Sequence, residues 1–530
     1  MFDVLISGGQ VLDGSGASAI RADVGIRAGR IAGIGNLAGQ QARQVLLAEG
    51  RIVSPGFIDL HAHDDFNLPL NPLQAGKVLQ GVTTDVVGNC GFSPAPIDPA
   101  RRELARELWS FLDSGLDLAW STFAEFLARM PPTGPNVVTL VGHVALRCAA
   151  MGAEDRAPTP AELERMRALT DEAMQAGAFG LSTGLIYPPC CYASTGEIVE
   201  LAKVAARHGG SYHTHMRDEG AGILDSIEEA VEIGRRSGAP VQISHLKVAN
   251  KANWGRAKEV LALIDRVRAE GVALTADQYP YTASSTGLKT LLPQWAHDGG
   301  SLALVARLND PAVRARIRAE VLATMGAGTI RIATWDDAIV SDSPSHPELA
   351  GLTLAVAGQK LDRQPVEALF DLLAADHAKT LGIFLSMDEE DLRAIMRHPA
   401  VGIGSDGIFL GVPGRPDRTK PHPRYFGTFP RVAGKYARDE AVLTLPEAVH
   451  KMTGLSARIL GLKERGLLRP GFAADVVVFD PKTVADTATF DKPHQAPTGI
   501  EAVIVNGVVT VHDRKLTGGV GGRVLKRQER

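Results

Sequence analysis

Eight short apolar runs, most of them separated by amphipathic stretches, constrain the fold of this chain more than any other feature. The runs cover residues 57–63, 83–90, 136–143, 178–185, 210–216, 240–247, 272–281 and 400–407. The segments between them, such as TPAELERMRALTDEAMQAG, place apolar residues at helical spacing. Continuous apolar strands that alternate with helices are typical of a parallel sheet covered on both faces, and eight repeats predict an α/β fold of the (β/α)8 TIM-like barrel type.

The two ends of the chain follow a different pattern from the middle. Residues 1–55 and 466–530 contain short strand-like alternations separated by glycine turns, for example in LLRPGFAADVVVFD. We expect these segments to join into one small β-sandwich domain, with the barrel formed by residues 56–465. The gap between the seventh and eighth runs, about 286–399, is far longer than the others and predicts an inserted lid subdomain over the barrel mouth.

Charge and cysteine content exclude several classes of protein. The chain has 56 Lys and Arg against 60 Asp and Glu, so no basic excess indicates a nucleic-acid or membrane partner. It contains no apolar run of membrane-spanning length and no basic, apolar leader. Four cysteines are too few for a disulfide scaffold, which predicts a cytoplasmic protein. Cys190 and Cys191 are interpreted as packing residues, with a strained vicinal disulfide as the weaker alternative. The sequence does not specify an oligomeric state.

Residues able to bind a metal cluster at the ends of the apolar runs. These are His61 and His63 in the first run, Cys90 in the second, His215 in the fifth, His245 in the sixth and Asp406 in the eighth. The carboxyl ends of barrel strands meet at one face, and residues two apart on a strand point to the same side. Imidazole and thiolate ligands favour Zn²⁺ over Mg²⁺ or Ca²⁺. Such an ion lowers the pKa of a bound water to about 7, and Asp406 would be the general base.

Each of these residues also has a structural interpretation. A single histidine at a strand end commonly packs or caps, and for His143, at the end of the third run, the two interpretations are balanced. His213 is better explained by packing or by support of a ligand. Cys90 alone could be a small core residue, and Asp406 in GSDG could form an Asx turn. The favoured hypothesis is a metal site, because chance does not readily place so many ligand types at strand ends.

With these residues in view, the chain resembles the amidohydrolase superfamily, and more closely the N-acyl-D-amino-acid deacylases, or D-aminoacylases. The resemblance extends over nearly the whole chain and rests on SPGFIDLHAHDD, GVTTDVVGNCGFSPAP, STGLIYPP, THMRDEG, ISHLK, DQYPYTASST, GSDG, RPDRTKPHPRYFGTFPRV and ERGLLRPGFAADVVVFDP. It implies a tight zinc site formed by Cys90, His215 and His245. A second, weaker site would include His61 and His63, with Cys90 able to bridge the two, and Asp406 would be the catalytic aspartate.

The resemblance also implies a reaction and a set of substrate contacts. The reaction is hydrolysis of a small molecule, an N-acyl-D-amino acid, to a carboxylate and a free D-amino acid; only the resemblance indicates the D configuration. The implied contacts are Tyr187, Lys247, Tyr279, Ser285 and Arg424. Lys247 and Arg424 are suited to pair with an α-carboxylate, and a tyrosine could donate to a developing oxyanion. A loop salt bridge for Arg424 and wall packing for the tyrosines are the structural alternatives.

Two other functions fit parts of the pattern. The first is a cyclic amidohydrolase acting on a hydantoin, dihydropyrimidine or lactam, which would use the same metal chemistry. The absence of an obvious bridging lysine, together with Lys247 and Arg424, counts against it. The second is a non-catalytic scaffold on the same fold, which the complete set of ligand residues makes the weakest of the three.

Overall fold

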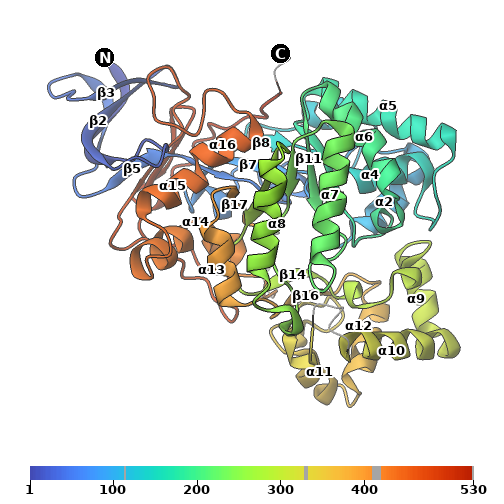
Figure 1. Cartoon of the computed structure of the whole chain (residues 1–530). Coiled ribbons are helices and arrows are strands. Elements are labelled where there is room, and N and C mark those ends of the chain that lie inside the picture. Colours follow the sequence, from blue (N-terminus) through green and yellow to red (C-terminus); the bar gives the residue numbers. More distant parts are fainter. Residues whose placement is uncertain (113–114, 327–331, 409–418, 528–530) are drawn as a thin grey trace.

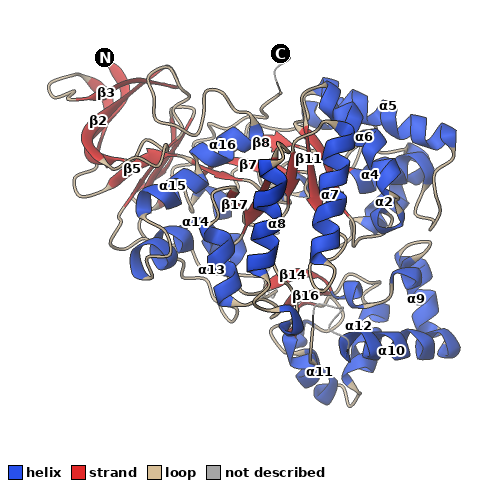
Figure 2. Ribbon diagram, viewed as in Figure 1, coloured by secondary structure: helices blue, strands red, loops and turns tan. Residues whose placement is uncertain are grey.

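The computed structural model describes residues 1–112, 115–326, 332–408 and 419–527. It is an α/β structure in which helices surround a central group of strands, with a separate sheet near both chain ends and a mainly helical lobe on the opposite side (Figures 1 and 2). No helix within these ranges combines the length and apolarity needed to cross a bilayer.

Two parallel sheets form the centre of the molecule. The first contains β6 (Phe57–Asp59), β7 (Val82–Val87) and β8 (Asn136–Thr139). The second has the spatial order β17 (Val401–Ile403), β13 (Leu274–Gln278), β12 (Val241–Ile243), β11 (Ser211–His215), β10 (Gly180–Gly184) and β9 (Val141–Gly142). Almost every residue of these strands is buried, which explains why their sequences are continuous apolar runs.

Backbone hydrogen bonds connect the two parallel sheets at both sides. The amide of Leu60, just after β6, donates to the carbonyl of Ile403 in β17 at 3.2 Å. On the other side, the amide of Phe179, just before β10, donates to the carbonyl of Thr139 in β8 at 2.8 Å. The carboxyl ends of the strands in both sheets therefore face the same region.

Helices pack around these strands. They are α4 (His143–Met151), α5 (Pro160–Ala176), α6 (Thr195–Arg207), α7 (Ile223–Ser237), α8 (Ala257–Ala269), α13 (Glu389–Arg397), α14 (Arg424–Arg431), α15 (Leu445–Met452) and α16 (Gly454–Leu460). Their sequences carry ordinary start signals: Thr159 and Glu162 form a capping box ahead of α5, with Pro160 as its first residue. In α7 the buried residues Ile223, Ile227 and Val231 follow the four-residue spacing of a helix face turned to the core.

Both ends of the chain contribute to one sheet. Its order is β21 (Lys515–Leu516), β20 (Val508–His512), β19 (Ile500–Val505), β18 (Val476–Phe479), β5 (Ile52–Pro55), β1 (Phe2–Val11), β2 (Ile20–Arg27) and β3 (Arg30–Gly35), and β4 (Ala42–Leu47) also pairs with β1. The join is antiparallel, with Val53 of β5 opposite Val478 of β18. The predicted partnership of the two ends is therefore present as strand pairing, while the division into a sandwich domain stays a prediction.

The long segment between the seventh and eighth runs has its own core. A three-stranded sheet has the order β14 (Ser284–Gly287), β16 (Leu381–Phe384) and β15 (Ala338–Asp342). The helices packed with it are α9 (Ser301–Asn309), α10 (Pro311–Gly326), α11 (Leu354–Lys360) and α12 (Pro365–Ala375), which form the lower lobe in Figure 1. Through β14 this lobe delivers Ser284, Ser285 and Thr286 to the central pocket.

Short elements complete the connections. They are α1 (Ala75–Val78), α2 (Arg102–Leu108), α3 (Phe123–Ala128), η1 (Asp64–Phe66), η2 (Pro99–Arg101), η3 (Cys190–Tyr192), η4 (Lys251–Asn253), η5 (Leu288–Leu291), η6 (Gln294–His297), η7 (Trp335–Asp337), η8 (Pro347–Leu349) and the π-helical η9 (Val432–Asp439).

The central strands are shorter than the apolar runs that predicted them; β6, for example, ends at Asp59, before His61 and His63. The third run ends at Gly142, and His143 is the first residue of α4 rather than the end of a strand. The eighth run ends at Ile403, because Asp406 adopts a positive φ of 47° that a strand cannot continue. The resulting turn after β17 carries Asp406 back toward the first strand.

Candidate metal centre and active site

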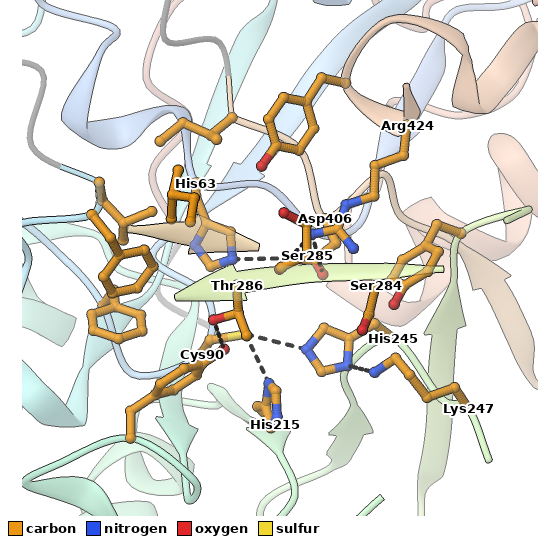
Figure 3. A pocket seen from close by; sticks show the side chains of 18 residues that line it. His63, Cys90, His215, His245, Lys247, Ser284, Ser285, Thr286, Asp406 and Arg424 are labelled. Atoms are coloured by element: carbon orange, nitrogen blue, oxygen red, sulfur yellow. Dashed lines mark hydrogen bonds and ion pairs between the residues drawn. The ribbon is translucent and has the colours of Figure 1, made fainter. Parts of the chain in front are cut away.

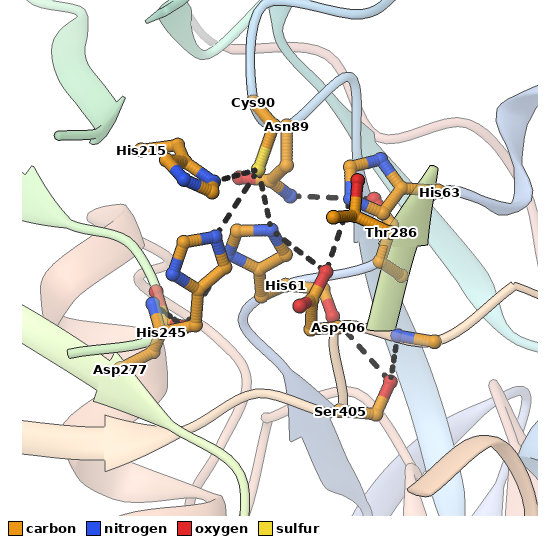
Figure 4. A network of polar contacts seen from close by, with 12 residues as sticks. His61, His63, Asn89, Cys90, His215, His245, Asp277, Thr286, Ser405 and Asp406 are labelled. Carbon is orange, nitrogen blue, oxygen red and sulfur yellow. Dashed lines mark hydrogen bonds and ion pairs between the residues drawn. The ribbon is translucent and has the colours of Figure 1, made fainter. Parts of the chain in front are cut away.

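Cys90 lies at the middle of a cluster of buried histidines (Figure 4). It follows β7 in a tight turn with φ +53°, between Gly88 and Gly91, which both have positive φ. A Cβ at Gly88 would lie 2.1 Å from the carbonyl oxygen of Leu140, and one at Gly91 would lie 2.9 Å from the amide nitrogen of Gly184. Only glycine fits these two positions, so the sequence GNCG is what allows the turn to place the thiol inside the pocket.

The sulfur of Cys90 is close to three imidazoles. It lies 3.4 Å from Nε2 of His245, 3.8 Å from Nδ1 of His215 and 3.2 Å from Nε2 of His61. Bond lengths of about 2.0–2.3 Å around a tetrahedral zinc ion put neighbouring ligand atoms roughly 3.5 Å apart. The sulfur and the nitrogens of His215 and His245 match this spacing, so the three residues fit one zinc ion.

A second group of possible ligands shares Cys90 with the first. It contains His61, His63, Cys90 and Asp406, whose donor atoms all lie within 4.8 Å of one another. Nε2 of His63 lies 3.2 Å from Oδ1 of Asp406, and Nε2 of His61 lies 3.5 Å from the same oxygen. This arrangement corresponds to the weaker second position that the resemblance implied, with Cys90 common to both.

Two carboxylates hold the far sides of these imidazoles. Oδ1 of Asp277 lies 3.3 Å from Nδ1 of His61, and Glu219 lies 3.0 Å from Nδ1 of His245 and 3.5 Å from Nε2 of His215. A carboxylate that accepts from the outer ring nitrogen fixes the tautomer and orientation of a metal-binding histidine. Glu219 and Asp277 are therefore placed to orient the three imidazoles so that the ring nitrogens near Cys90 can bind a metal ion.

The electrostatics of the cluster suit a cation. Burial, with a contribution from Lys247, lowers the pKa of His245 to about 4, so this imidazole is in the neutral form that metals bind. Burial, assisted by Asp406, raises the pKa of the Cys90 thiol well above its ordinary value. A divalent metal ion would lower the pKa of this thiol again, because it stabilises the thiolate form.

Asp406 is held in its ionised form. Burial by itself would raise its pKa, but the guanidinium of Arg424, followed by His245 and His63, keeps the pKa well below the usual range. Nη2 of Arg424 lies 2.9 Å from Oδ2 of Asp406. The carboxylate can therefore accept a proton at the oxygen that faces His61 and His63.

Arg424 has hydrogen-bonding capacity left over. Its Nη2 also donates to the carbonyl oxygen of Ser285 at 3.2 Å, and its guanidinium carbon lies 4.6 Å above the ring of Tyr279. Among the residues that the structure describes, its Nε and Nη1 have no hydrogen-bond partner although both are buried. Buried donors without partners are costly, so these two atoms indicate a place for an anionic ligand.

The other predicted substrate contacts also line the pocket around Arg424 (Figure 3). Lys247 contacts Glu219 closely, and its Nζ lies 2.7 Å from Nδ1 of His245. The hydroxyl of Tyr187 lies 3.0 Å from Oγ1 of Thr286, and its ring centre lies 5.1 Å from that of His215. The structure thus brings Tyr187, Lys247, Tyr279, Ser285 and Arg424 together, and it places Lys247 against the carboxylate that orients two histidines.

His143 and His213, for which structural interpretations were balanced or favoured, lie outside the cluster around Cys90. Nε2 of His143 lies 2.9 Å from Oε1 of Glu197, which also accepts from Arg147, so this histidine belongs to a buried ion-pair network. Nε2 of His213 lies 2.9 Å from Oγ of Ser211. All four cysteines are free thiols, which excludes a vicinal disulfide between Cys190 and Cys191.

Sequence reasoning missed two carboxylates that the site uses. Asp277 lies within the seventh run but is the second-to-last residue of β13 (Leu274–Gln278), so the strand-end argument would have selected it had the end of the strand been predicted correctly. Glu219 follows His215 by four residues in THMRDEG, but no strand or helix pattern indicates that it faces the metal ligands.

An apolar wall lies opposite the cations of the pocket and was also missed. It includes Phe92, Phe111 and Tyr187, and an adjoining cavity shares these three side chains and contains Lys289. Nζ of Lys289 lies 5.8 Å from the centre of the Phe111 ring, and Lys289 forms no ion pair with any residue in the described ranges. A cation therefore lies beyond the aromatic side of the pocket.

Comparison with known proteins gives consistent relationships. The model of the family described as "Amidohydrolase family" matches residues 44–511. The chain is 40% identical to D-aminoacylase of Alcaligenes xylosoxydans xylosoxydans over 99% of this chain and 98% of that protein. It is also 40% identical to N-acyl-D-glutamate deacylase of the same organism, over 99% and 96%. This chain also superposes on a crystal structure of N-acyl-D-glutamate deacylase from Bordetella bronchiseptica, with a TM-score of 0.83 and 38% identity over 99% of this chain and 100% of that one. That structure is a complex with zinc and a phosphonate inhibitor that mimics the tetrahedral intermediate.

Proposed function

The chain belongs to the amidohydrolase family, and on this premise we propose that it hydrolyses the amide bond of N-acyl-D-amino acids. The products are a carboxylate and a free D-amino acid, and the enzyme depends on zinc. Relatives that are 40% identical over almost the entire chain are named as deacylases of this class. The observation that carries the proposal is the convergence of three imidazoles within 3.8 Å of the Cys90 sulfur, beside a buried carboxylate.

The donor set indicates which residues hold the metal. Cys90, His215 and His245 would bind the tight zinc ion, and His61 and His63 would form a second position with Cys90. When bound, zinc polarises the amide carbonyl and lowers the pKa of the attacking water. Glu219 and Asp277 keep the imidazoles in the required tautomer.

Asp406 supplies the proton transfers. Its carboxylate is ionised, buried and 3.2 Å from His63, so it accepts the proton of the attacking water at Oδ1. The same oxygen then donates that proton to the leaving nitrogen as the carbon–nitrogen bond breaks. General acid–base catalysis of this kind contributes about 10²- to 10⁴-fold to a rate.

Arg424 recognises the α-carboxylate. Its buried Nε and Nη1 are the donors that an anion would satisfy, and a guanidinium binds a carboxylate through two parallel hydrogen bonds. The ring of Tyr279 supports the guanidinium from one side. Tyr187, Lys247 and Ser285 border the remaining space, where the hydroxyl of Tyr187 can donate to the developing oxyanion.

We infer in addition that the two parallel sheets form a single closed (β/α)8 barrel. The hydrogen bonds from Leu60 to Ile403 and from Phe179 to Thr139 support closure at both sides. Counting β8 and β9 as one strand interrupted at Leu140 yields eight strands. The β-sandwich of residues 1–55 and 466–530, the lid of about 286–399 and a cytoplasmic location stay predictions.

Activity of the purified enzyme on matched substrates tests the proposed function. N-acetyl-D- and N-acetyl-L-amino acids, hydantoin and dihydrouracil are supplied separately, with and without added Zn²⁺. We expect turnover of the D series alone, lost on chelation and restored by zinc. Preferential turnover of the cyclic imides would support the cyclic amidohydrolase instead, and a chain that retains no zinc after purification would contradict the proposal.

A further inference from the structure

Lys77 is buried beneath the catalytic residues and is not explained by metal or substrate binding. It lies in α1, is 1% exposed and directs its ammonium group at polar atoms from three separate strand ends. Nζ donates to Oδ2 of Asp59 at 2.5 Å and to Oγ of Ser405 at 2.8 Å. It also lies 3.2 Å from Asp64 and 3.4 Å from Asp85.

These contacts join the end of β6, just before His61 and His63, to the turn that carries the proposed catalytic aspartate. Asp59, two residues before His61, accepts from the amide of Ser405 at 2.7 Å and from the hydroxyl of Ser405 at 2.5 Å. The hydroxyl of Ser405 in turn accepts from the amide of Gly407 at 3.0 Å. Ser405 and Gly407 flank Asp406, so the network holds the turn on both sides of that residue (Figure 4).

The turn needs such support because its conformation is unfavourable. Asp406 has φ +47°, in the left-handed region that costs an L-residue about 1 kcal/mol or more. Its amide donates to the carbonyl of His61 at 2.8 Å, and the carbonyl of Gly407 accepts from the amide of His63 at 2.9 Å. A Cβ on Gly407 would lie 2.7 Å from Oγ of Ser405 and 3.4 Å from Nζ of Lys77, so the turn is packed directly onto the network.

Removing a lysine from water is costly unless carboxylates compensate. Burial alone would lower the pKa of Lys77, but Asp59, Asp85 and Asp64 raise it above its ordinary value, so the side chain remains an ammonium donor. A buried ion pair is weak evidence for stability, whereas fixing one conformation is its better supported use. Here the conformation that it fixes is the one that places Oδ1 of Asp406 beside His63 and His61.

We propose that Lys77, acting through Asp59 and the hydroxyl of Ser405, is the positioning residue that holds the Asp406 turn in register with the His61–His63 segment after β6 for proton transfer. This inference rests on the proposed function, because it assigns Lys77 and Ser405 to the step in which Asp406 moves the proton. Neither residue touches the substrate pocket, so their effect should appear in kcat and not in KM.

The decisive variant is Ser405→Ala, because it removes the hydroxyl contacts of the turn with Lys77, Asp59 and the amide of Gly407. The backbone amide of residue 405 still donates to Asp59, and Lys77 keeps Asp59 and Asp64 as partners. We expect kcat to fall about 10- to 100-fold, since a displacement near 1 Å is enough for such losses. KM and zinc content should stay at the wild-type values. Lys77→Met should reduce kcat at least as far, and the double variant should lose no more than Lys77→Met alone, because both changes act on one turn.

Ser456→Ala is the matched control. Ser456 in α16 is equally buried, and its hydroxyl donates to the backbone carbonyl of Lys451 in α15, away from the pocket. It should lower the melting temperature by about as much as Ser405→Ala without changing kcat. If Lys77→Met does not fold, Ser405→Ala still tests the proposal.

Wild-type kcat in Ser405→Ala, or a loss of kcat that follows loss of zinc, would overturn the positioning role. If the wild-type enzyme does not hydrolyse N-acyl-D-amino acids, the proposed function fails separately. The crystal structure of Ser405→Ala then tests the inference by itself: an Asp406 carboxylate displaced from His63 supports it, and an unchanged carboxylate contradicts it.

Discussion

The guanidinium of Arg424 lies 2.9 Å from the carboxylate of Asp406, so the residue expected to bind the substrate and the residue expected to move the proton form one buried ion pair. The pair keeps Asp406 ionised and fixes the orientation of Arg424. Because only Nη2 of the guanidinium is used within the described structure, Nε and Nη1 remain for the substrate. Substrate binding and base orientation are therefore linked through one side chain.

Replacing Arg424 should weaken substrate binding strongly. For Arg424→Met, we expect kcat/KM for N-acetyl-D-amino acids to fall about 10²- to 10³-fold, with a higher KM because a buried charged hydrogen bond to the carboxylate is lost. A lower kcat should accompany it, because Asp406 also loses its ion-pair partner. Steady-state kinetics measure this. Arg431→Met is the control in the same helix, since Arg431 pairs with Asp486 outside the pocket. An unchanged KM in Arg424→Met would show that another group binds the carboxylate.

Asp406→Asn should separate catalysis from metal binding. The amide keeps the size of the side chain but cannot accept the proton, so kcat should fall about 10²- to 10⁴-fold. Zinc at the proposed tight site should remain at the wild-type value, because its candidate ligands Cys90, His215 and His245 do not include Asp406. Near wild-type turnover would mean that Asp406 is not the general base.

Cys90→Ala should remove the metal itself. The sulfur is common to both groups of possible ligands, so the substitution takes one ligand from each. We expect zinc to be lost on dialysis, together with activity, as measured by elemental analysis and kinetics. Cys148→Ala, at a buried thiol outside both groups, should retain both. Stoichiometric zinc in dialysed Cys90→Ala would exclude the proposed ligand set.

Glu219→Gln should weaken zinc binding without removing a ligand. Its carboxylate contacts the outer nitrogens of His215 and His245, and loss of such support typically costs about 10- to 100-fold in metal affinity. Competition with a chelator measures the affinity. Glu229→Gln, which disturbs an ion pair with Arg217 away from the ligands, should leave it unchanged. If Glu219→Gln and Glu229→Gln bound zinc with equal affinity, Glu219 would not orient the histidine ligands.

Lys289 should favour acidic substrates in a pH-dependent manner. Burial lowers its pKa to about 8, with Glu107 opposing the shift, so the ammonium is present below that pH and is lost as the pH rises through it. The preference for N-acetyl-D-glutamate over N-acetyl-D-methionine, as a ratio of kcat/KM, should therefore decline above about pH 8 in the free enzyme. Lys289→Met should reduce this ratio about tenfold and make it independent of pH, because one charged hydrogen bond is removed.

Lys360→Met is the control for that experiment, since Lys360 lies at the end of α11 on the same lobe and does not line the pocket. Its ratio should match that of the wild-type enzyme at every pH. If the kcat/KM ratio of Lys289→Met equalled that of the wild-type enzyme, Lys289 would not contribute to recognition of acidic side chains.

Local sequence was sufficient to select the candidate metal ligands that the structure brings together. The two-residue spacing of His61 and His63 predicted a shared side, although both residues follow the end of β6 at Asp59. Cys90, His215 and His245 meet because parallel strands bring their carboxyl ends together. These arguments need only residue types and periodicity. They also located the pairing of the chain ends, since alternating apolar residues must be covered by another layer.

Periodicity could not show which charges are partners. Glu219 reaches two histidines, Asp277 supports His61, and Lys77 joins Asp59 to Ser405, which lies 328 positions after Lys77. Such distances depend on strand register, on turns with positive φ at Cys90 and Asp406, and on the packing of every layer between them. The sequence by itself determined which chemical groups gather at the mouth of the strands. The tertiary structure alone decided how they are oriented and paired, because a shift near 1 Å makes or breaks a hydrogen bond. Such a shift does not change the local sequence pattern.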